Sequence, residues 1–206
     1  MARGEKESGL IMYLAAFLGG LAIFFATHYF TAFRLRTEGG LAQRMGRGPY
    51  MGLYSVVTLV GFVLMVWGFA NLKPWIPIWT PPVWTRHIAM LLMLPATVLI
   101  VAAYLPTGFI KRAVRHPMLA AVKLWAFAHL IANGDLASII LFGAFLIYGV
   151  VDRIAVKRRG DVGAANATPN IIGDFLALGI GGGLYAAIIY YLHPLLFGVP
   201  VIIRGG

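Results

Sequence analysis

Six long apolar runs constrain this chain more than any other feature of its sequence. They cover residues 10–33, 53–71, 87–105, 117–132, 136–151 and 175–197, and Lys123 is the one charged residue inside them. About 20 apolar residues in a helix cross the hydrocarbon core of a bilayer. Because lipid offers the backbone no hydrogen-bond partner, such segments cross as helices. The sequence therefore predicts an all-α, polytopic membrane bundle of about six transmembrane helices.

The composition excludes the soluble classes of protein. Hydrophobic residues make up 60% of the chain and charged residues 12%, whereas soluble domains have about 45–50% and about 25%. The net charge of +10 lies between the apolar runs, so it indicates topology and not a nucleic-acid surface. The runs are too closely spaced for a second soluble domain, and we predict one integral membrane domain over residues 1–206, with the lipid bilayer as its main partner.

The distribution of lysine and arginine predicts the orientation, because cytoplasmic loops carry an excess of both. The first, third and fifth connections hold eleven of these residues: Arg34, Arg36, Arg44, Arg47, Lys111, Arg112, Arg115, Arg153, Lys157, Arg158 and Arg159. The opposite side holds five: Arg3, Lys6, Lys73, Arg86 and Arg204. Both termini are therefore expected to face away from the cytoplasm. The segment 73–84, rich in tryptophan and proline, is expected to anchor the opposite interface.

Histidines are the most plausible ligands for a metal or haem in this chain. With no cysteine, thiolate ligation and iron–sulfur clusters are excluded. His87 and His193 lie near the outer ends of their spans and are predicted to be interfacial. His28 and His129 lie within spans, where an ionisable residue is costly and usually functional. His116 begins the fourth span in an Arg-His-Pro sequence, where a helix start explains it equally well.

Lys123 is unusual because it is predicted to lie in the middle of the membrane, where an ammonium needs a partner. That partner could be Asp135, Asp152 or Asp174, or the carboxylate of a ligand such as a haem propionate. Asp135 also precedes the fifth span, where it is expected to serve as the N-cap of the helix.

His129 shares a helical face with Trp125 and Asn133, which lie four residues before and after it. A neutral imidazole buried among helices, with its second nitrogen donating a hydrogen bond, is the usual arrangement of an iron ligand in a helical bundle. His129 is therefore the first candidate ligand and His28 the second.

Several stretches of the chain closely resemble the bacterial NnrU family: residues 91–95, 101–104, 116–120, 123–126, 129–135 and 152–153. Residues 45–46, 52–55 and 66–68 fit the same pattern. NnrU proteins are integral membrane proteins named for an association with nitrite and nitric oxide reduction. The resemblance implies a multi-pass protein of the bacterial inner membrane, and the charge count then predicts periplasmic termini. Denitrification enzymes or other membrane redox proteins are the implied partners.

The same domain resembles the 15-cis-zeta-carotene isomerases, haem b membrane proteins whose iron is held by histidines. Carried over by position, this resemblance implies haem b bound by His28 and His129, with His116 as a third candidate. Lys123 is added to this cofactor site as the possible partner of a haem propionate. His28 lies about 7.5 Å and His129 about 18 Å from the inner ends of their spans, so pairing His28 with His116 remains an alternative. After Trp125 the chain departs from the isomerase pattern, which leaves isomerase chemistry less supported than haem binding.

Two other functions remain open at this point, and the sequence does not decide whether the protein is an enzyme. One is a non-catalytic membrane assembly factor for a denitrification complex. The other is an isoprenylcysteine-type membrane methyltransferase, which shares an Arg-His-Pro helix start. Here His116-Pro117 is not followed by the tyrosine and glycine of that class, and its glutamate has no counterpart.

The charge distribution gives a topology that can be tested directly. Reporter fusions made after Arg47 and after Arg159 are expected to give cytoplasmic signals, because both positions follow basic connections. A periplasmic signal from both fusions would contradict the predicted orientation.

Overall fold

The computed structural model describes residues 2–34 and 41–202, and its helices confirm the predicted all-α class. Two of the basic residues counted above, Arg36 and Arg204, lie outside the described residues. The chain forms two compact units, Met1–Ile76 and Pro77–Gly206.

The helices follow one another with short connections in both units. Unit 1 contains α1 (Ala2–Arg34), α2 (Leu41–Met45) and α3 (Arg47–Asn71). Unit 2 contains α4 (Val83–Tyr104), α5 (Phe109–Val114), α6 (Pro117–Ala132), α7 (Leu136–Arg158), the 3-10 turn η1 (Gly163–Asn166), α8 (Ile171–Ala187), the π-helical turn η2 (Ile188–Leu192) and α9 (His193–Phe197).

Five helical segments within the described residues are long and apolar enough to cross a membrane. They correspond to five of the six predicted spans, and the remaining one, the fourth, is the 16-residue helix α6. Several helices extend beyond the apolar runs that predicted them; α3, for example, begins at Arg47, and α7 continues to Arg158. The extension of α7 ends in basic residues, which stabilise the C-terminal end of a helix dipole.

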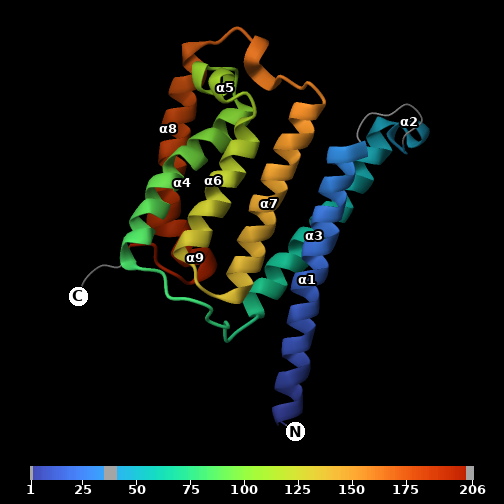
Figure 1. Cartoon of the computed structure of the whole chain (residues 1–206), viewed down its shortest axis with the longest axis vertical. Coiled ribbons are helices and arrows are strands. Elements are labelled where there is room, and N and C mark those ends of the chain that lie inside the picture. The colour runs from blue at the N-terminus through green and yellow to red at the C-terminus, as the bar shows by residue number, and fades with distance from the viewer. Residues whose placement is uncertain (1, 35–40, 203–206) are drawn as a thin grey trace. The chain divides into compact units, whose positions relative to one another are not determined.

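In unit 1, α1 and α3 pack so closely that glycine is required at the contact (Figure 1). A Cβ added at Gly61 would lie 2.8 Å from the backbone nitrogen of Phe24. Cβ atoms added at Gly20 and Gly68 would collide with the backbones of Met65 and Phe17. Small residues that let helix backbones approach are a main source of association energy in lipid, where the hydrophobic effect is absent.

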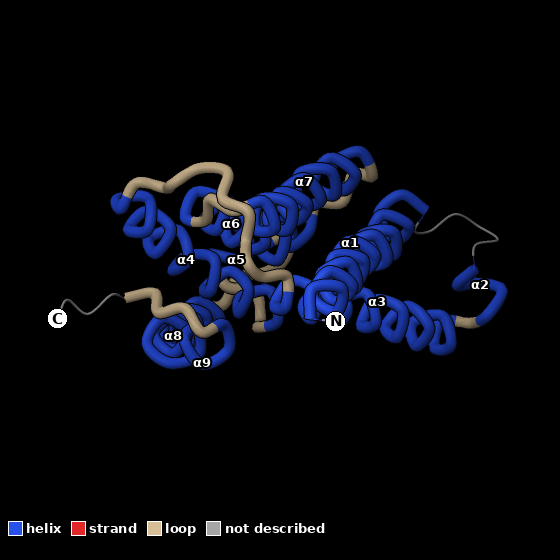
Figure 2. The backbone as a smooth tube through the Cα atoms, turned by 90° about the horizontal axis from the view of Figure 1, so that it is seen from below, coloured by secondary structure: helices blue, strands red, loops and turns tan. Residues whose placement is uncertain are grey.

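In unit 2, α4 packs against both α6 and α8, and α7 packs against α6 (Figures 1 and 2). The contact of α8 with α4 includes Gly181, whose added Cβ would lie 2.6 Å from the Cα of Val98. Nothing lies within 4 Å of the corresponding position at Gly179, Gly182 or Gly183. Of the four glycines in this span, Gly181 is therefore the one that the described contacts require.

Hydrogen bonds of two side chains connect α4, α5 and α8 at one end of unit 2. The apolar runs did not predict the short helix α5. The buried carboxylate of Asp174 accepts hydrogen bonds from the backbone nitrogens of Phe109 (2.8 Å) and Ile110 (2.9 Å) at the start of α5. Lys111 Nζ donates to the carbonyl oxygens of Ala103 (2.9 Å) and Leu105 (2.8 Å) at the end of α4. These bonds satisfy backbone groups that helix ends leave without partners.

At the other end of unit 2, the turn between α6 and α7 contacts the tryptophan- and proline-rich segment. The carbonyl oxygen of Gly134 accepts hydrogen bonds from the backbone nitrogens of Ile78 (2.8 Å) and Trp79 (3.1 Å). Asp135 Oδ1 accepts from the backbone nitrogen of Ser138 at 2.8 Å, which confirms its predicted role as the N-cap of α7. Trp79 and Trp84 are exposed, as aromatic anchors at a membrane interface are.

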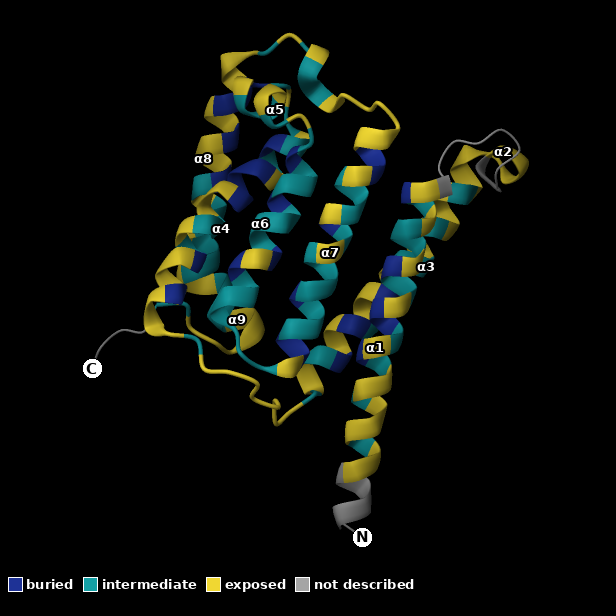
Figure 3. Ribbon diagram, viewed as in Figure 1, coloured by how far each residue is buried: buried dark blue, intermediate teal, exposed yellow. Residues whose placement is uncertain are grey.

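The outer faces of the long helices are apolar and exposed, as the yellow faces of α1 and α3 in Figure 3 illustrate. On α3 alone the exposed hydrophobic residues include Leu53, Val56, Leu59, Val60 and Val63. In water such continuous apolar surfaces would drive aggregation. They are suited to contact lipid, as expected of a multi-pass membrane protein.

The contact of α1 with α3 provides a matched pair of substitutions. Gly20→Ala is expected to lower the free energy of unfolding by about 1–3 kcal/mol, because its Cβ meets the backbone of α3 and a packed helix pair must separate to admit it. Gly19→Ala on the same helix has open space around it and gains the same intrinsic helix propensity. Unfolding of both variants in detergent measures the difference, and equal stability would contradict the close contact.

Candidate functional site

His129 lies half-buried in α6, with its ring oriented by its own helix. Its Nδ1 is 2.8 Å from the carbonyl oxygen of Trp125. A carbonyl oxygen only accepts hydrogen bonds, so Nδ1 carries the proton. In the neutral ring Nε2 therefore holds the lone pair that a metal ion needs.

Aromatic rings enclose His129 from two helices. Phe142 of α7 stacks on the imidazole with ring centroids 4.6 Å apart and planes at 28°. The Trp125 ring lies 5.3 Å from the imidazole and meets Phe142 edge to face at 5.1 Å. Asn133 Nδ2 donates to the carbonyl oxygen of His129 at 2.9 Å. The ring is thus held both by hydrogen bonding and by stacking.

His28 in unit 1 has the same local arrangement. Its Nδ1 lies 2.7 Å from the carbonyl oxygen of Phe24, four residues earlier in α1. The same argument assigns the proton to Nδ1 and the lone pair to Nε2. The Phe24 ring stacks on the imidazole with centroids 4.1 Å apart, and Tyr54 of α3 lies 5.9 Å away. The two candidate ligands therefore share one tautomer and one kind of aromatic support.

The other three histidines have different surroundings. His116 immediately precedes α6, and its Nε2 donates to the carbonyl oxygen of Asp161 at 3.2 Å, in the loop after α7. His87 is exposed on α4. His193 begins α9, and its Nδ1 lies 2.7 Å from the carbonyl oxygen of Val199. In none of these three does Nδ1 bond to a carbonyl oxygen of the same helix while a phenylalanine stacks on the imidazole.

The three carboxylates considered as partners for Lys123 have other roles. Asp135 caps α7 and Asp174 accepts from the backbone of α5. Asp152 accepts from the hydroxyl of Tyr148 at 3.3 Å. The stem of Lys123 packs against Gly149 of α7, where an added Cβ would lie 2.7 Å from its Cγ. Among the described residues, no carboxylate forms an ion pair with the Lys123 ammonium.

In the described part of the chain, no group of three His, Asp or Glu side chains is arranged to hold a metal ion. Haem iron needs fewer protein ligands, since the porphyrin supplies four nitrogens and the protein supplies the axial ones. A neutral imidazole with a protonated Nδ1 and a donor Nε2 is the chemistry of such a ligand. His28 and His129 both fit this requirement.

The supporting residues Phe24 and Phe142 were not singled out by sequence reasoning. The sequence does carry a signal for Phe24, because an aromatic residue lies four positions before each candidate histidine: Phe24 before His28 and Trp125 before His129. This spacing places both residues on one helical face. Phe142 belongs to another helix, so only tertiary structure reveals its contact.

Comparison with protein-family models matches residues 16–201 to the family described as NnrU protein. Comparisons with curated proteins and with solved structures gave no match. The family match extends over most of both compact units. It contains the candidate histidines and Lys123, together with the long apolar helices. This chain is therefore a membrane protein of the NnrU family, as the motif resemblance predicted.

Proposed function

We propose that this NnrU-family protein binds haem b in the membrane through Nε2 of His28 and Nε2 of His129. Its function is then electron transfer or redox sensing linked to nitrite and nitric oxide reduction. The observation that carries the proposal is the shared arrangement of the two histidines. In each, Nδ1 donates to the carbonyl oxygen four residues earlier and a phenylalanine stacks on the ring.

The bond from Nδ1 prepares each imidazole for iron. It fixes the neutral tautomer, raises the basicity of Nε2 and restrains rotation of the ring. Stacking by Phe24 on His28 and by Phe142 on His129 restrains the ring plane further. Both rings therefore lose little conformational freedom when they ligate a metal.

Lys123 has a separate role in this proposal. It lies on α6, six residues before His129, and its stem is held against Gly149. A haem propionate is the carboxylate that we assign to its ammonium, because a charge-assisted bond would offset the cost of placing that charge inside the bundle. Pairing with a propionate also orients the cofactor relative to α6.

Haem b supplies reversible one-electron chemistry when it is bound. His28 and His129 would both hold the iron, and a haem held by two histidines would be suited to electron transfer or redox sensing. Binding of nitric oxide at the iron would require His28 or His129 to leave.

Removal of one proposed ligand tests the function directly. Protein made with adequate haem supply is expected to show a Soret band, and His129→Ala is expected to remove or shift it, because the iron loses an axial nitrogen. His87→Ala is the matched control, since this histidine is exposed on α4. The absorption spectrum of the detergent-purified protein is the measurement. Protein that is made with adequate haem supply and is still colourless would contradict haem binding and favour a non-catalytic assembly role.

Lys123→Met tests the role of the ammonium, since methionine can keep the packing of the stem on Gly149 while removing the charge. We expect a lower haem content at equal haem supply, because the propionate loses its partner. The melting temperature of haem-free protein is not expected to fall, since an isolated charge at that depth costs about 2.5–3.5 kcal/mol. Lys123→Arg should restore part of the haem content. Wild-type haem content in Lys123→Met would contradict the assigned role.

A further inference from the structure

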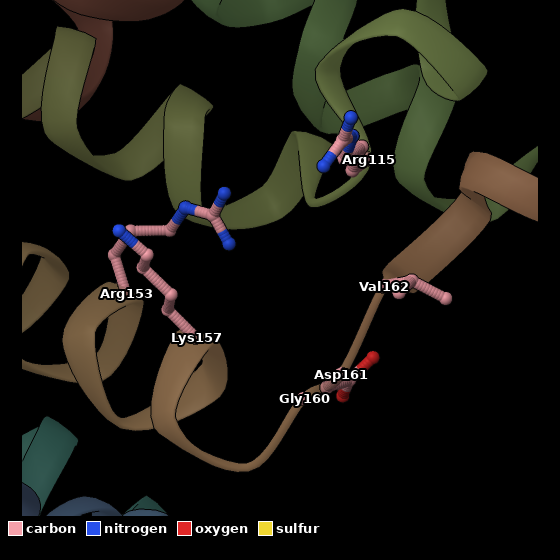
Figure 4. A pocket seen from close by; sticks show the side chains of 6 residues that line it. All are labelled: Arg115, Arg153, Lys157, Gly160, Asp161 and Val162. Atoms are coloured by element: carbon pink, nitrogen blue, oxygen red, sulfur yellow. The ribbon is translucent and has the colours of Figure 1, made fainter.

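One end of unit 2 contains a hollow of about 200 Å³ whose lining includes three basic side chains. Its lining residues are Arg115, Arg153, Lys157, Gly160, Asp161 and Val162. They come from three segments: the turn between α5 and α6, the last turns of α7, and the loop after α7 (Figure 4). Arg115 of the third connection and Arg153 and Lys157 of the fifth thus line one hollow.

The charges in this hollow are not balanced within the protein. Its lining holds three cationic side chains, Arg115, Arg153 and Lys157, and one carboxylate, that of Asp161. The Asp161 carboxylate already accepts a hydrogen bond from the backbone nitrogen of Gly163 at 2.9 Å. Among the described residues, none of the three cations forms an ion pair. An anion bearing several acceptor oxygens would complement them.

The turn that carries Arg115 has a strained backbone. Arg115 has φ 68° and ψ −50°, and the backbone nitrogen of His116 donates to the carbonyl oxygen of Val114 at 2.8 Å. This is a γ-turn with positive φ, which is rare for a residue with a side chain. Such strain persists where the surroundings enforce it and is concentrated at binding sites.

The loop after α7 holds this turn in place. The backbone nitrogen of Ala164 donates to the carbonyl oxygen of Arg115 at 3.0 Å, and His116 Nε2 donates to that of Asp161. Gly163 lies so close to the turn that an added Cβ would collide with the Arg115 carbonyl oxygen. The hollow is therefore a built feature of the fold, since loop and turn fix each other.

We propose that this hollow binds a phosphate group, carried by an anionic phospholipid or present as free phosphate. Arginine and lysine are the side chains that recognise phosphate oxygens. The position favours the lipid: Arg153 and Lys157 lie about 26 and about 32 Å along α7 from Leu136, on either side of the roughly 30 Å thickness of a hydrocarbon core. Basic pockets between helices at this depth bind lipid headgroups.

The test compares two double variants that remove the same charge from the same end of unit 2. Arg153→Gln with Lys157→Gln changes the hollow. Arg112→Gln with Arg158→Gln is the matched control, because both residues are exposed and neither lines it. Native mass spectrometry measures retention of phosphatidylglycerol against phosphatidylcholine. We expect the first variant to retain phosphatidylglycerol about tenfold less than wild type, and the control to stay within about twofold.

Further arms separate the sources of the phosphate and the effect of shape. Two results would assign free phosphate to the same site. Inorganic phosphate would displace phosphatidylglycerol, or phosphate alone would raise the melting temperature of the wild-type protein above that of a chloride control. Gly163→Ala leaves the charge unchanged and is expected to weaken retention by displacing the Arg115 turn. Equal loss in both double variants would overturn the proposal in favour of general surface attraction. Absence of both a phosphatidylglycerol preference and a phosphate effect in wild type would overturn it as well.

Discussion

Inside a bilayer, polar groups must find hydrogen-bond partners within the protein, and the placement of polar side chains in this chain follows from that constraint. Thr27 donates to the carbonyl oxygen of Phe24 at 2.7 Å and Thr97 to that of Leu94 at 2.8 Å. His28 and His129 use the same solution through Nδ1. Satisfying one ring nitrogen inside the helix leaves the other as a Lewis base, so a requirement of membrane folding also prepares a ligand.

The same constraint explains why several other polar side chains lie at helix ends. Asp135, Asp174 and Lys111 all bind free backbone groups at helix ends, where each helix has donors or acceptors to offer. Lys123 differs because its ammonium lies away from a helix end and forms no ion pair with the described residues. A charge retained at such a position is most simply explained by a ligand, which is the reason for its place in the proposed haem site.

The sequence predicts features that depend on local pattern and misses those that depend on contacts between distant residues. Apolar run length predicted the helices, and a carboxylate before a run predicted the cap at Asp135. The helix α5 escaped prediction because six residues give little periodicity, and a distant residue, Asp174, caps it. The close contact of Gly149 with Lys123 and the basic hollow around Arg115 depend on how α6, α7 and the following loop pack. For the candidate site, the family motifs indicated His28 and His129, whereas the tautomer and the stacked phenylalanines required the structure.

The central claim is that His28 and His129, as neutral imidazoles, are the protein ligands of haem iron. Electron paramagnetic resonance of the ferric protein, with histidine labelled by nitrogen-15, tests it most directly. The account predicts a low-spin signal with hyperfine coupling to two axial imidazole nitrogens. A high-spin signal, or coupling to a single histidine nitrogen, would contradict ligation by both His28 and His129.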